Sequence, residues 1–197
     1  MADLEAAAAA ARAGELVVYP TETVYGLGGD ALDARVVERV FEAKGRPRSN
    51  PMALGVHAPE AAVEYVDPAA ITERFMTAFL PGPVTIVCRR RPHVPAALAG
   101  GGDRVGVRVP DHDLARELLR QAGPLTATSA NRSGEPSVRD VGDLPVAIRE
   151  AVAAVVDGGP TPGGASTVVD VERGVIHRRG RGVDRVEAWL RERAALG

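Results

Sequence analysis

The sequence predicts an α/β protein built on a sheet of mixed strand direction. Short apolar runs bounded by Gly and Pro alternate with segments whose apolar residues recur at helical spacing. The two kinds of segment interleave without the regular strand–helix–strand rhythm that predicts an all-parallel sheet. The chain has 197 residues, 45% of them hydrophobic and 25% charged, with no internal repeat. This composition is ordinary for one globular domain.

The N-terminal half is expected to begin with a helix, a strand and a second helix. The alanine-rich run Ala6–Ala11 predicts a helix capped by Asp3. Leu16–Tyr19 is a short apolar run ending at Pro20, which predicts a buried strand, and a Gly-rich turn is expected after it. Asp33 is the predicted cap of the second helix. The elements expected next are a loop over 44–51, a strand over Met52–Val56, a helix over Pro68–Leu80 and a strand over Val84–Cys88.

The C-terminal half begins with the alternating sequence RVGVRV over Arg104–Val109. This pattern predicts a strand with Arg104, Gly106 and Arg108 on one face. The elements expected after it are a helix over 113–121, a strand over Pro124–Thr128, a helix over Pro145–Ala151, strands over Ala153–Val156, Thr167–Val171 and Val175–His177, and a closing helix over Val183–Ala195.

Composition excludes several classes of protein. The single cysteine, Cys88, excludes an internal disulfide and a cysteine-based metal cluster, and it fits a reducing compartment. No run of about 18 apolar residues offers a membrane span, and the N-terminal run lacks the basic flank of a signal peptide. We therefore expect a cytoplasmic protein with no membrane contact. The net charge of −2 gives no overall attraction to nucleic acid, so phosphate binding would need a local basic patch.

Lysine and asparagine are scarce. Lys44 is the one lysine among 24 basic residues, and Asn50 and Asn131 are the two asparagines. A GC-rich genome would deplete both residue types, so the survivors mark positions where substitutes fail, unless they remain by chance. An ammonium is a compact point charge and a guanidinium is not. On this reasoning Lys44 contacts a phosphate, and the variant Lys44→Arg keeps its melting temperature but loses activity.

Three polar turns, two of them after predicted strands and one after a predicted helix, offer candidate binding groups. The sequence PTETVYGLG (20–28) puts two threonines, a carboxylate and a phenol where open α/β sheets bind ligands, although a simple turn is the alternative. KGRPRSNP (44–51) has three cations within five residues, which suits either a polyphosphate cradle or a solvated basic loop. TATSANRSGEPS (126–137) carries small hydroxyl residues that leave backbone N–H groups open to an anion, unless it is a flexible surface loop.

The usual catalytic signatures are missing: the sequence has no GxSxG elbow, no HExxH, no P-loop and no GxGxxG after a strand. Arg108 on its predicted strand can instead hold a carboxylate by two parallel hydrogen bonds. A small polar turn, a strand and an arginine also follow one another from Gly163 to Arg178. The candidate site therefore offers cations and backbone donors rather than a nucleophile.

These motifs together carry a family resemblance. PTETVYGLG, KGRP..NP, FLPGPVT, GVRVP, TATSANRSGEPS and STVVD followed by IHRRG, in this order, resemble the threonylcarbamoyl-AMP synthases, the YrdC-like proteins. The resemblance extends from about Gly14 to Arg181. It implies a twisted mixed sheet with flanking helices around a deep basic cleft. Residues 1–197 are expected to form a single YrdC-like catalytic domain, similar to the short form of the family.

The resemblance also implies a reaction. L-Threonine, bicarbonate and ATP would give threonylcarbamoyl-AMP, pyrophosphate and water, which makes the protein a nucleotidyltransferase. Mg²⁺ would be carried by ATP, with no metal ligand from the protein. A downstream transferase complex would then form threonylcarbamoyladenosine at tRNA position 37, and tRNA itself is a further candidate partner. The roles implied are catalysis for Lys44 and Arg46; ATP binding for Lys44, Arg46, Asn50, Ser129, Ser137 and Arg178; and threonine binding for Thr23, Arg108, Ala127 and Ser166.

Two positions depart from the family pattern, and two other readings remain. Gly55 stands where longer relatives often have a His that contacts threonine, and the nearby His57 is not assigned that role. Arg104 stands where many relatives have a Thr facing ATP.

An RNA-binding YrdC-like module without synthase activity is the alternative, but 4% aromatic residues give few rings for base stacking. A carbamoyl-transfer domain of hydrogenase maturation proteins would sit beside a zinc finger, which one cysteine excludes here.

Overall fold

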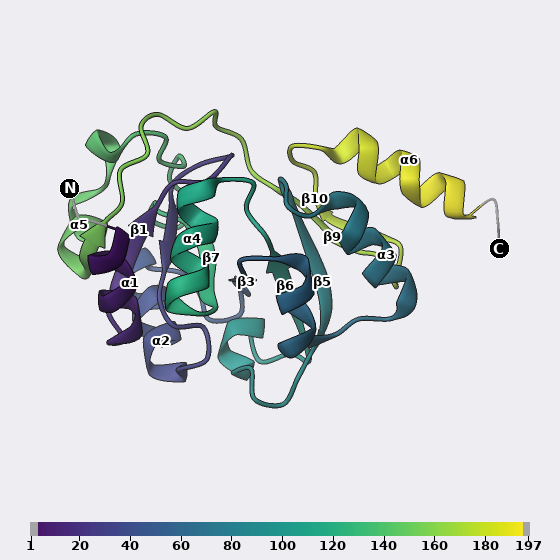
Figure 1. Ribbon diagram of the computed structural model, residues 1–197, viewed down its shortest axis with the longest axis horizontal. Helices are drawn as coiled ribbons and strands as arrows, with labels where there is room; N and C mark the ends of the chain where they lie inside the picture. Colours follow the sequence, from purple (N-terminus) through teal and green to yellow (C-terminus); the bar gives the residue numbers. More distant parts are fainter. Residues whose placement is uncertain (1–3, 195–197) are drawn as a thin grey trace.

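A computed structural model describes residues 4–194 and shows one ten-stranded sheet, as Figure 1 illustrates. Its strands are β1 (Leu16–Tyr19), β2 (Gly26–Gly28), β3 (Ala53–Gly55), β4 (Val66–Asp67), β5 (Val84–Arg90), β6 (Arg104–Arg108), β7 (Leu125–Ser129), β8 (Val152–Val155), β9 (Thr167–Asp170) and β10 (Val175–Arg178). The order is β10-β9-β5-β6-β3-β7-β2-β1-β8, and β4 pairs with β5 outside this path. The β1–β8, β3–β6 and β5–β9 pairs are parallel and the other pairs are antiparallel, so the predicted mixed sheet is confirmed.

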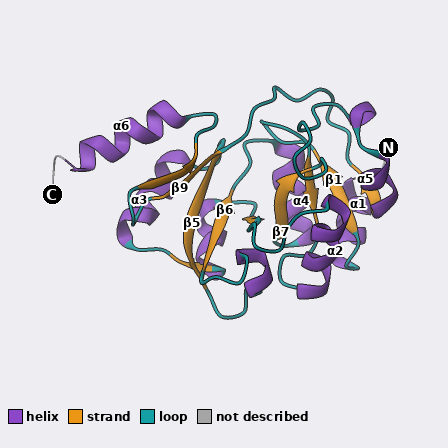
Figure 2. Ribbon diagram, turned by 180° about the vertical axis from the view of Figure 1, so that it is seen from behind, coloured by secondary structure: helices purple, strands orange, loops and turns teal. Residues whose placement is uncertain are grey.

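Helices cover the two ends of this sheet. They are α1 (Leu4–Arg12), α2 (Ala34–Lys44), α3 (Ala70–Phe79), α4 (Asp113–Ala122), α5 (Val146–Ala151) and α6 (Val183–Ala194), with short 3-10 helices at Pro59–Glu64, Ala96–Ala99 and Val141–Asp143. Seen from behind, α1, α2 and α4 gather around β1 and β7, while α3 and α6 lie at the β9 end (Figure 2). Across residues 4–194, none of these helices has both the length and the apolar character needed to cross a membrane.

Most predicted elements are present with ends shifted by at most two residues, but the Gly-rich turn is partly a strand. Gly26–Gly28 forms β2, which lies between β1 and β7. A Cβ atom at Gly26 or Gly28 would lie 3.1 or 2.9 Å from the ring of Tyr19, so glycine is required there by close packing. A run of glycine has little strand propensity, and the turn prediction for these residues was wrong for that reason. The predicted Asp3 cap and the Ala195 helix end lie outside the described residues.

Helix α2 positions the first loop of the site. The Asp33 carboxylate accepts a hydrogen bond from the Arg35 N–H at 2.8 Å and so caps its start, as predicted. The helix ends at Gly45, whose φ of 58° is in the left-handed region that glycine adopts readily. Lys44 is therefore the last helical residue, and the chain turns sharply into the loop that follows.

The sheet is buried on both faces at one end and open on one face in its middle. In β1, Leu16 and Val18 pack into one apolar cluster while Val17 and Tyr19 pack into another on the opposite face. In β6, Val105 and Val107 are buried in the core, whereas Arg104, Gly106 and Arg108 share the other face, as the alternation predicts. A cleft opens over this face, and the candidate site forms in it.

Candidate functional site

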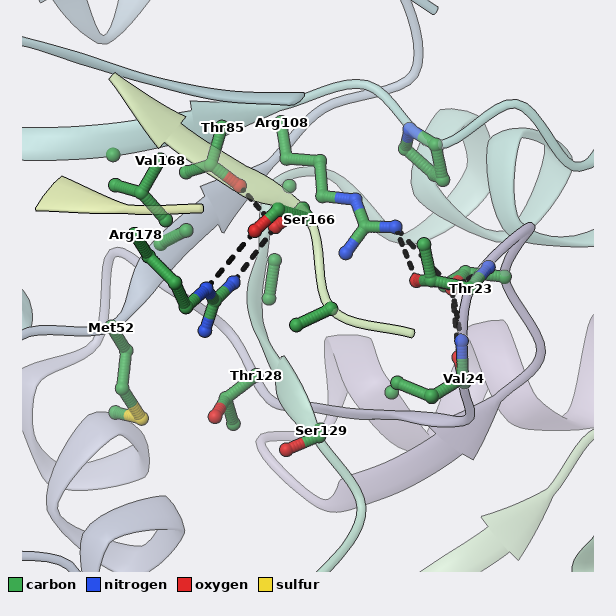
Figure 3. A pocket seen from close by; sticks show the side chains of 18 of the residues that line it. Thr23, Val24, Met52, Thr85, Arg108, Thr128, Ser129, Ser166, Val168 and Arg178 are labelled. Atoms are coloured by element: carbon green, nitrogen blue, oxygen red, sulfur yellow. Dashed lines mark hydrogen bonds between the residues drawn. The ribbon is translucent and has the colours of Figure 1, made fainter. Parts of the chain in front are cut away.

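A cleft of about 1100 Å³, including space open to solvent, lies over the exposed face of β6. Eight of the residues singled out by the sequence line it, namely Thr23, Arg46, Arg108, Ala127, Ser129, Ser137, Ser166 and Arg178. They come from six separate segments of the chain, and Figure 3 shows several of them facing the same space.

One end of the cleft is built around Arg108 and the 21–24 turn. Arg108 Nη2 donates to Thr23 Oγ1 at 2.7 Å and to Glu22 Oε1 at 3.0 Å. The Thr21 and Thr23 hydroxyl oxygens are 2.9 Å apart, and Thr21 donates to the Val24 carbonyl at 2.7 Å. The guanidinium is thus fixed by a buried hydroxyl pair and by one carboxylate.

The same end holds polar atoms without partners. Arg108 Nε and Glu22 Oε2 are buried and make no hydrogen bond. A buried polar atom without a partner is costly, and a ligand that reaches it supplies the missing bond. Sequence reasoning placed Glu22 in a polar turn but did not pair it with Arg108, because the two residues are 86 positions apart.

A second group surrounds Ser166. Arg178 donates from Nε to the Ser166 carbonyl at 3.0 Å and from Nη2 to Ser166 Oγ at 2.9 Å. Ser166 Oγ also lies 2.9 Å from Thr85 Oγ1, a residue that was not predicted at the site. These dashed contacts are visible in Figure 3. Desolvation in the cleft, and then the nearby charges of Arg108 and Arg46, lower the pKa of Arg178.

Only one of the three cations in the 44–51 loop faces the cleft. Arg46 lines it and donates to the carbonyls of Asn50 at 3.0 Å and Pro51 at 2.9 Å, which closes the loop on itself. Arg48 points away and pairs with Glu38 at 2.9 Å on α2. The loop therefore directs Arg46 toward the cleft and uses Arg48 to hold itself against the helix.

Lys44 lies behind the cleft wall. Its side chain is buried, and Nζ donates to the Ser129 carbonyl at 2.5 Å and to the Asn131 carbonyl at 2.6 Å. Burial, and then the charge of Arg46, lower its pKa to about 8. Neither Lys44 nor the exposed Asn50 lines the cleft. Both hold loops in place: Asn50 through its carbonyl bond to Arg46, and Lys44 through the 129–131 turn.

The cleft lining is basic. Among the described residues it contains four arginines and no Asp or Glu. Arg104 is balanced by Asp170 at 2.9 Å and Glu172 at 3.0 Å, which leaves Arg46, Arg108 and Arg178 as the main source of positive potential. Within residues 4–194, no group of three or more His, Cys, Asp or Glu side chains is placed to hold a metal ion. The arrangement is suited to an extended anionic ligand with a carboxylate at Arg108 and phosphates near Arg46 and Arg178.

Comparison with known proteins gives a consistent picture. The Sua5/YciO/YrdC family model, described as "Telomere recombination", matches residues 9–180. A threonylcarbamoyl-AMP synthase of Pyrococcus abyssi is 42% identical over 164 residues, which is 81% of this chain and 48% of that protein. One of Bacillus subtilis is 37% identical over 166 residues, which is 83% of this chain and 48% of that protein. The chain thus spans about half the length of these curated relatives.

A solved structure agrees with these relatives. The crystal structure of P. abyssi Sua5 complexed with L-threonine superposes with a TM-score of 0.82 and is 38% identical. The match covers 90% of this chain and 54% of that one. The twisted mixed sheet with flanking helices is therefore the fold of this family.

The buried position of Lys44 changes what Lys44→Arg is expected to do. The larger guanidinium does not fit between two carbonyls that a compact ammonium holds at 2.5 and 2.6 Å, so the stability should fall by about 1–3 kcal/mol. Melting temperature measured by circular dichroism checks this. The reverse exchange at a neighbouring exposed position, Arg48→Lys, is the control and should change stability by less than about 0.5 kcal/mol. A Lys44→Arg protein that melts like the wild type would contradict the buried role.

Proposed function

The chain belongs to the Sua5/YciO/YrdC family, and on that premise we propose that it is an L-threonylcarbamoyladenylate synthase. In this proposal L-threonine, bicarbonate and ATP give threonylcarbamoyl-AMP, pyrophosphate and water. The observation that carries it is the single cleft in which Arg108, suited to a carboxylate, lies beside two arginines suited to phosphates. The names of the relatives and the threonine complex of P. abyssi Sua5 support the same reading.

Threonine is assigned to the Arg108 end of the cleft. The guanidinium binds the amino-acid carboxylate, to which it is matched in charge and in planar geometry. The Thr23 hydroxyl, held by Thr21, is positioned to bond the substrate, with Ala127 and Ser166 forming the adjoining wall. A site that bonds the threonine hydroxyl rejects valine strongly, because valine leaves that partner unpaired.

ATP is assigned to the remainder of the cleft. Arg46 and Arg178 bind the phosphates, and the Ser129 and Ser137 hydroxyls add neutral hydrogen-bonding groups. Lys44 and Asn50, which were also expected at the nucleotide, lie outside the lining. We therefore assign them the positioning of the 129–131 turn and the 46–51 loop. Mg²⁺ would enter on the phosphates and help neutralise them, since phosphate oxygens are the hard ligands it prefers and no carboxylate of residues 4–194 lines the cleft.

The chemistry proceeds without an enzyme nucleophile. The amine of threonine combines with bicarbonate to form N-carboxythreonine and water. Its new carboxylate oxygen then attacks the α-phosphorus of ATP in line, and the bond to the β-phosphate oxygen breaks to release pyrophosphate. Holding the reactants together can supply about 7–11 kcal/mol through proximity. Arg46 and Arg178 stabilise the charge that develops on the α-phosphate and on the leaving pyrophosphate.

The setting of the reaction follows from its substrates. A nucleotidyltransferase that consumes ATP and feeds tRNA modification works in the cytoplasm. Its product would pass to a tRNA threonylcarbamoyl transferase complex, which modifies position 37. The alternative of an RNA-binding module is weaker. Among residues 4–194, Tyr19 is the one aromatic residue lining the cleft, and it is buried and donates to the Thr126 carbonyl at 3.3 Å. It offers no free ring for base stacking.

The proposal predicts that ATP is cleaved between its α- and β-phosphates only when threonine and bicarbonate are both present. Incubation with carbon-labelled bicarbonate, followed by chromatography, should show label in an AMP-linked product together with pyrophosphate. Omission of either threonine or bicarbonate is the control and should abolish both products. Release of ADP and orthophosphate would contradict nucleotidyl transfer.

Arg108→Ala should weaken the free energy of threonine binding by about 2–4 kcal/mol. The substitution removes the guanidinium that pairs with the threonine carboxylate, and it leaves Glu22 partly buried and unpaired. ATP binding without threonine should change little, as calorimetric titration can show. Arg120→Ala is a matched control, since Arg120 also pairs with a glutamate, at 2.6 Å, but on an exposed face of α4. Loss of ATP affinity with threonine affinity retained would mean that the two ends of the cleft are assigned the wrong way round.

A further inference from the structure

A segment without regular secondary structure forms part of one wall of the cleft. β8 and β9 lie toward opposite ends of the strand order, so residues 156–166, which join them, cross from one end of the sheet to the other (Figure 1). The last two residues of this crossing segment, Ala165 and Ser166, line the cleft. The segment contains four glycines and two prolines, and none of its backbone belongs to a helix or a strand. Contacts other than secondary structure must therefore hold it in place.

The crossing segment is fixed to the turn that carries Thr23. The Gly163 N–H donates to the Thr23 carbonyl at 2.6 Å. Two residues earlier, the Thr161 N–H donates to the Arg139 carbonyl at 2.8 Å, and Arg139 Nε donates to the Thr161 carbonyl at 3.1 Å. The segment thus links the wall that carries Ser166 to the turn that carries Thr23.

Arg181 forms a second link between the same two parts. Its backbone N–H donates to the Ala165 carbonyl at 2.8 Å, so its own position follows that of the crossing segment. Its side chain reaches back along the segment, where Nη1 donates to the Gly163 carbonyl at 3.1 Å and to the Glu22 carbonyl at 3.4 Å. Glu22 lies in the 21–24 turn, 159 positions from Arg181. One nitrogen atom therefore holds both the crossing segment and the turn.

The crossing segment is shaped to accept this side chain. A Cβ atom at Gly164 would lie 3.0 Å from Cγ and 3.1 Å from Cδ of Arg181, so glycine lets the arginine stem pack against the backbone. The φ of Gly164, 86°, also lies in the left-handed region that favours glycine. Arg181 itself is exposed and lies outside the cleft lining. It must therefore act on a ligand in the cleft through the residues that it holds.

We propose that Arg181 is a positioning residue that fixes the spacing of Thr23 and Ser166, the two hydroxyl-bearing residues assigned to the threonine site. The inference rests on the proposed function for the identity of the ligand, and it adds a residue outside the cleft that aligns the amino-acid end. In Figure 3 the end of the Arg108 side chain lies between Ser166 and Thr23. The spacing of these two residues therefore sets the room around the guanidinium that binds the threonine carboxylate.

Truncation of the side chain tests this role. In Arg181→Ala the Glu22 and Gly163 carbonyls lose their shared donor, whereas the N–H of residue 181 keeps its bond to Ala165. Titration calorimetry of the full chain should show threonine bound about three- to tenfold more weakly, which corresponds to the net free energy of one hydrogen bond. ATP affinity should not change, because the wall beside Arg178 is retained. Arg181→Lys, whose ammonium can still donate to one of the two carbonyls, should bind threonine with an intermediate affinity.

Arg179→Ala is the matched control. Arg179 is exposed, lies two residues from Arg181 and pairs with Glu187 on α6. This variant should bind threonine and ATP like the wild type. Unchanged threonine affinity in Arg181→Ala would overturn the proposal, and equal weakening of threonine and ATP would make Arg181 a general structural residue instead.

Hydrogen exchange tests the link in the absence of a ligand. The Gly163 amide, which bonds to the Thr23 carbonyl, should exchange faster in Arg181→Ala than in the wild type or the control, and an unchanged rate would overturn the inference. A wild type that binds no threonine would contradict the proposed function, while the exchange rate would still decide the role of Arg181, so the two failures are distinguishable. If Arg181→Ala does not fold, Arg181→Lys decides by the same two measurements.

Discussion

Of the four arginines that line the cleft, three lack the pair of carboxylates that balances Arg104, and much of the structure serves to hold these three there against their repulsion. Arg46, Arg108 and Arg178 come from a loop, from β6 and from β10. Desolvation by burial, and then the charges of Arg108 and Arg46, lower the pKa of Arg178. Among residues 4–194, Arg108 alone of the three has a carboxylate partner, so the unliganded site is short of negative charge. We therefore expect an anionic ligand to stabilise this arrangement and a neutral ligand not to do so.

The loops around the cleft provide the contacts that hold these like-charged arginines in place. Each of the three arginines is fixed by hydroxyl or carbonyl oxygens from its own or a neighbouring turn, which orient a guanidinium without cancelling its charge. The turns are held in turn by other contacts. The buried Lys44 ammonium fixes the 129–131 turn by donating hydrogen bonds to two of its carbonyls, and the left-handed conformation of Gly45 ends α2 directly after Lys44. In this way the end of one helix determines where the hydroxyl groups of β7 lie in the cleft.

The sequence was informative where the signal is local. Runs of β-branched residues and the alternation in RVGVRV predicted the strands and the face shared by Arg104 and Arg108. It was uninformative where a contact joins distant segments. The pairing of Arg104 with Asp170 spans 66 positions, and the burial of Lys44 depends on a turn 85 positions away. Residue type alone made Lys44 and Arg48 look like phosphate ligands, whereas packing turned one inward to backbone carbonyls and the other outward to Glu38.

Arg46, Arg108 and Arg178 should be stabilised by a bound anion, and thermal denaturation with inorganic pyrophosphate tests this expectation most directly. Pyrophosphate carries the charge of the proposed ligand but neither its base nor its amino acid. The melting temperature should rise with pyrophosphate concentration in the wild type and in Arg74→Gln, whose substituted residue is exposed on α3. It should not rise in Arg178→Gln. A wild type unaffected by pyrophosphate, or an equal rise in Arg178→Gln, would contradict the account.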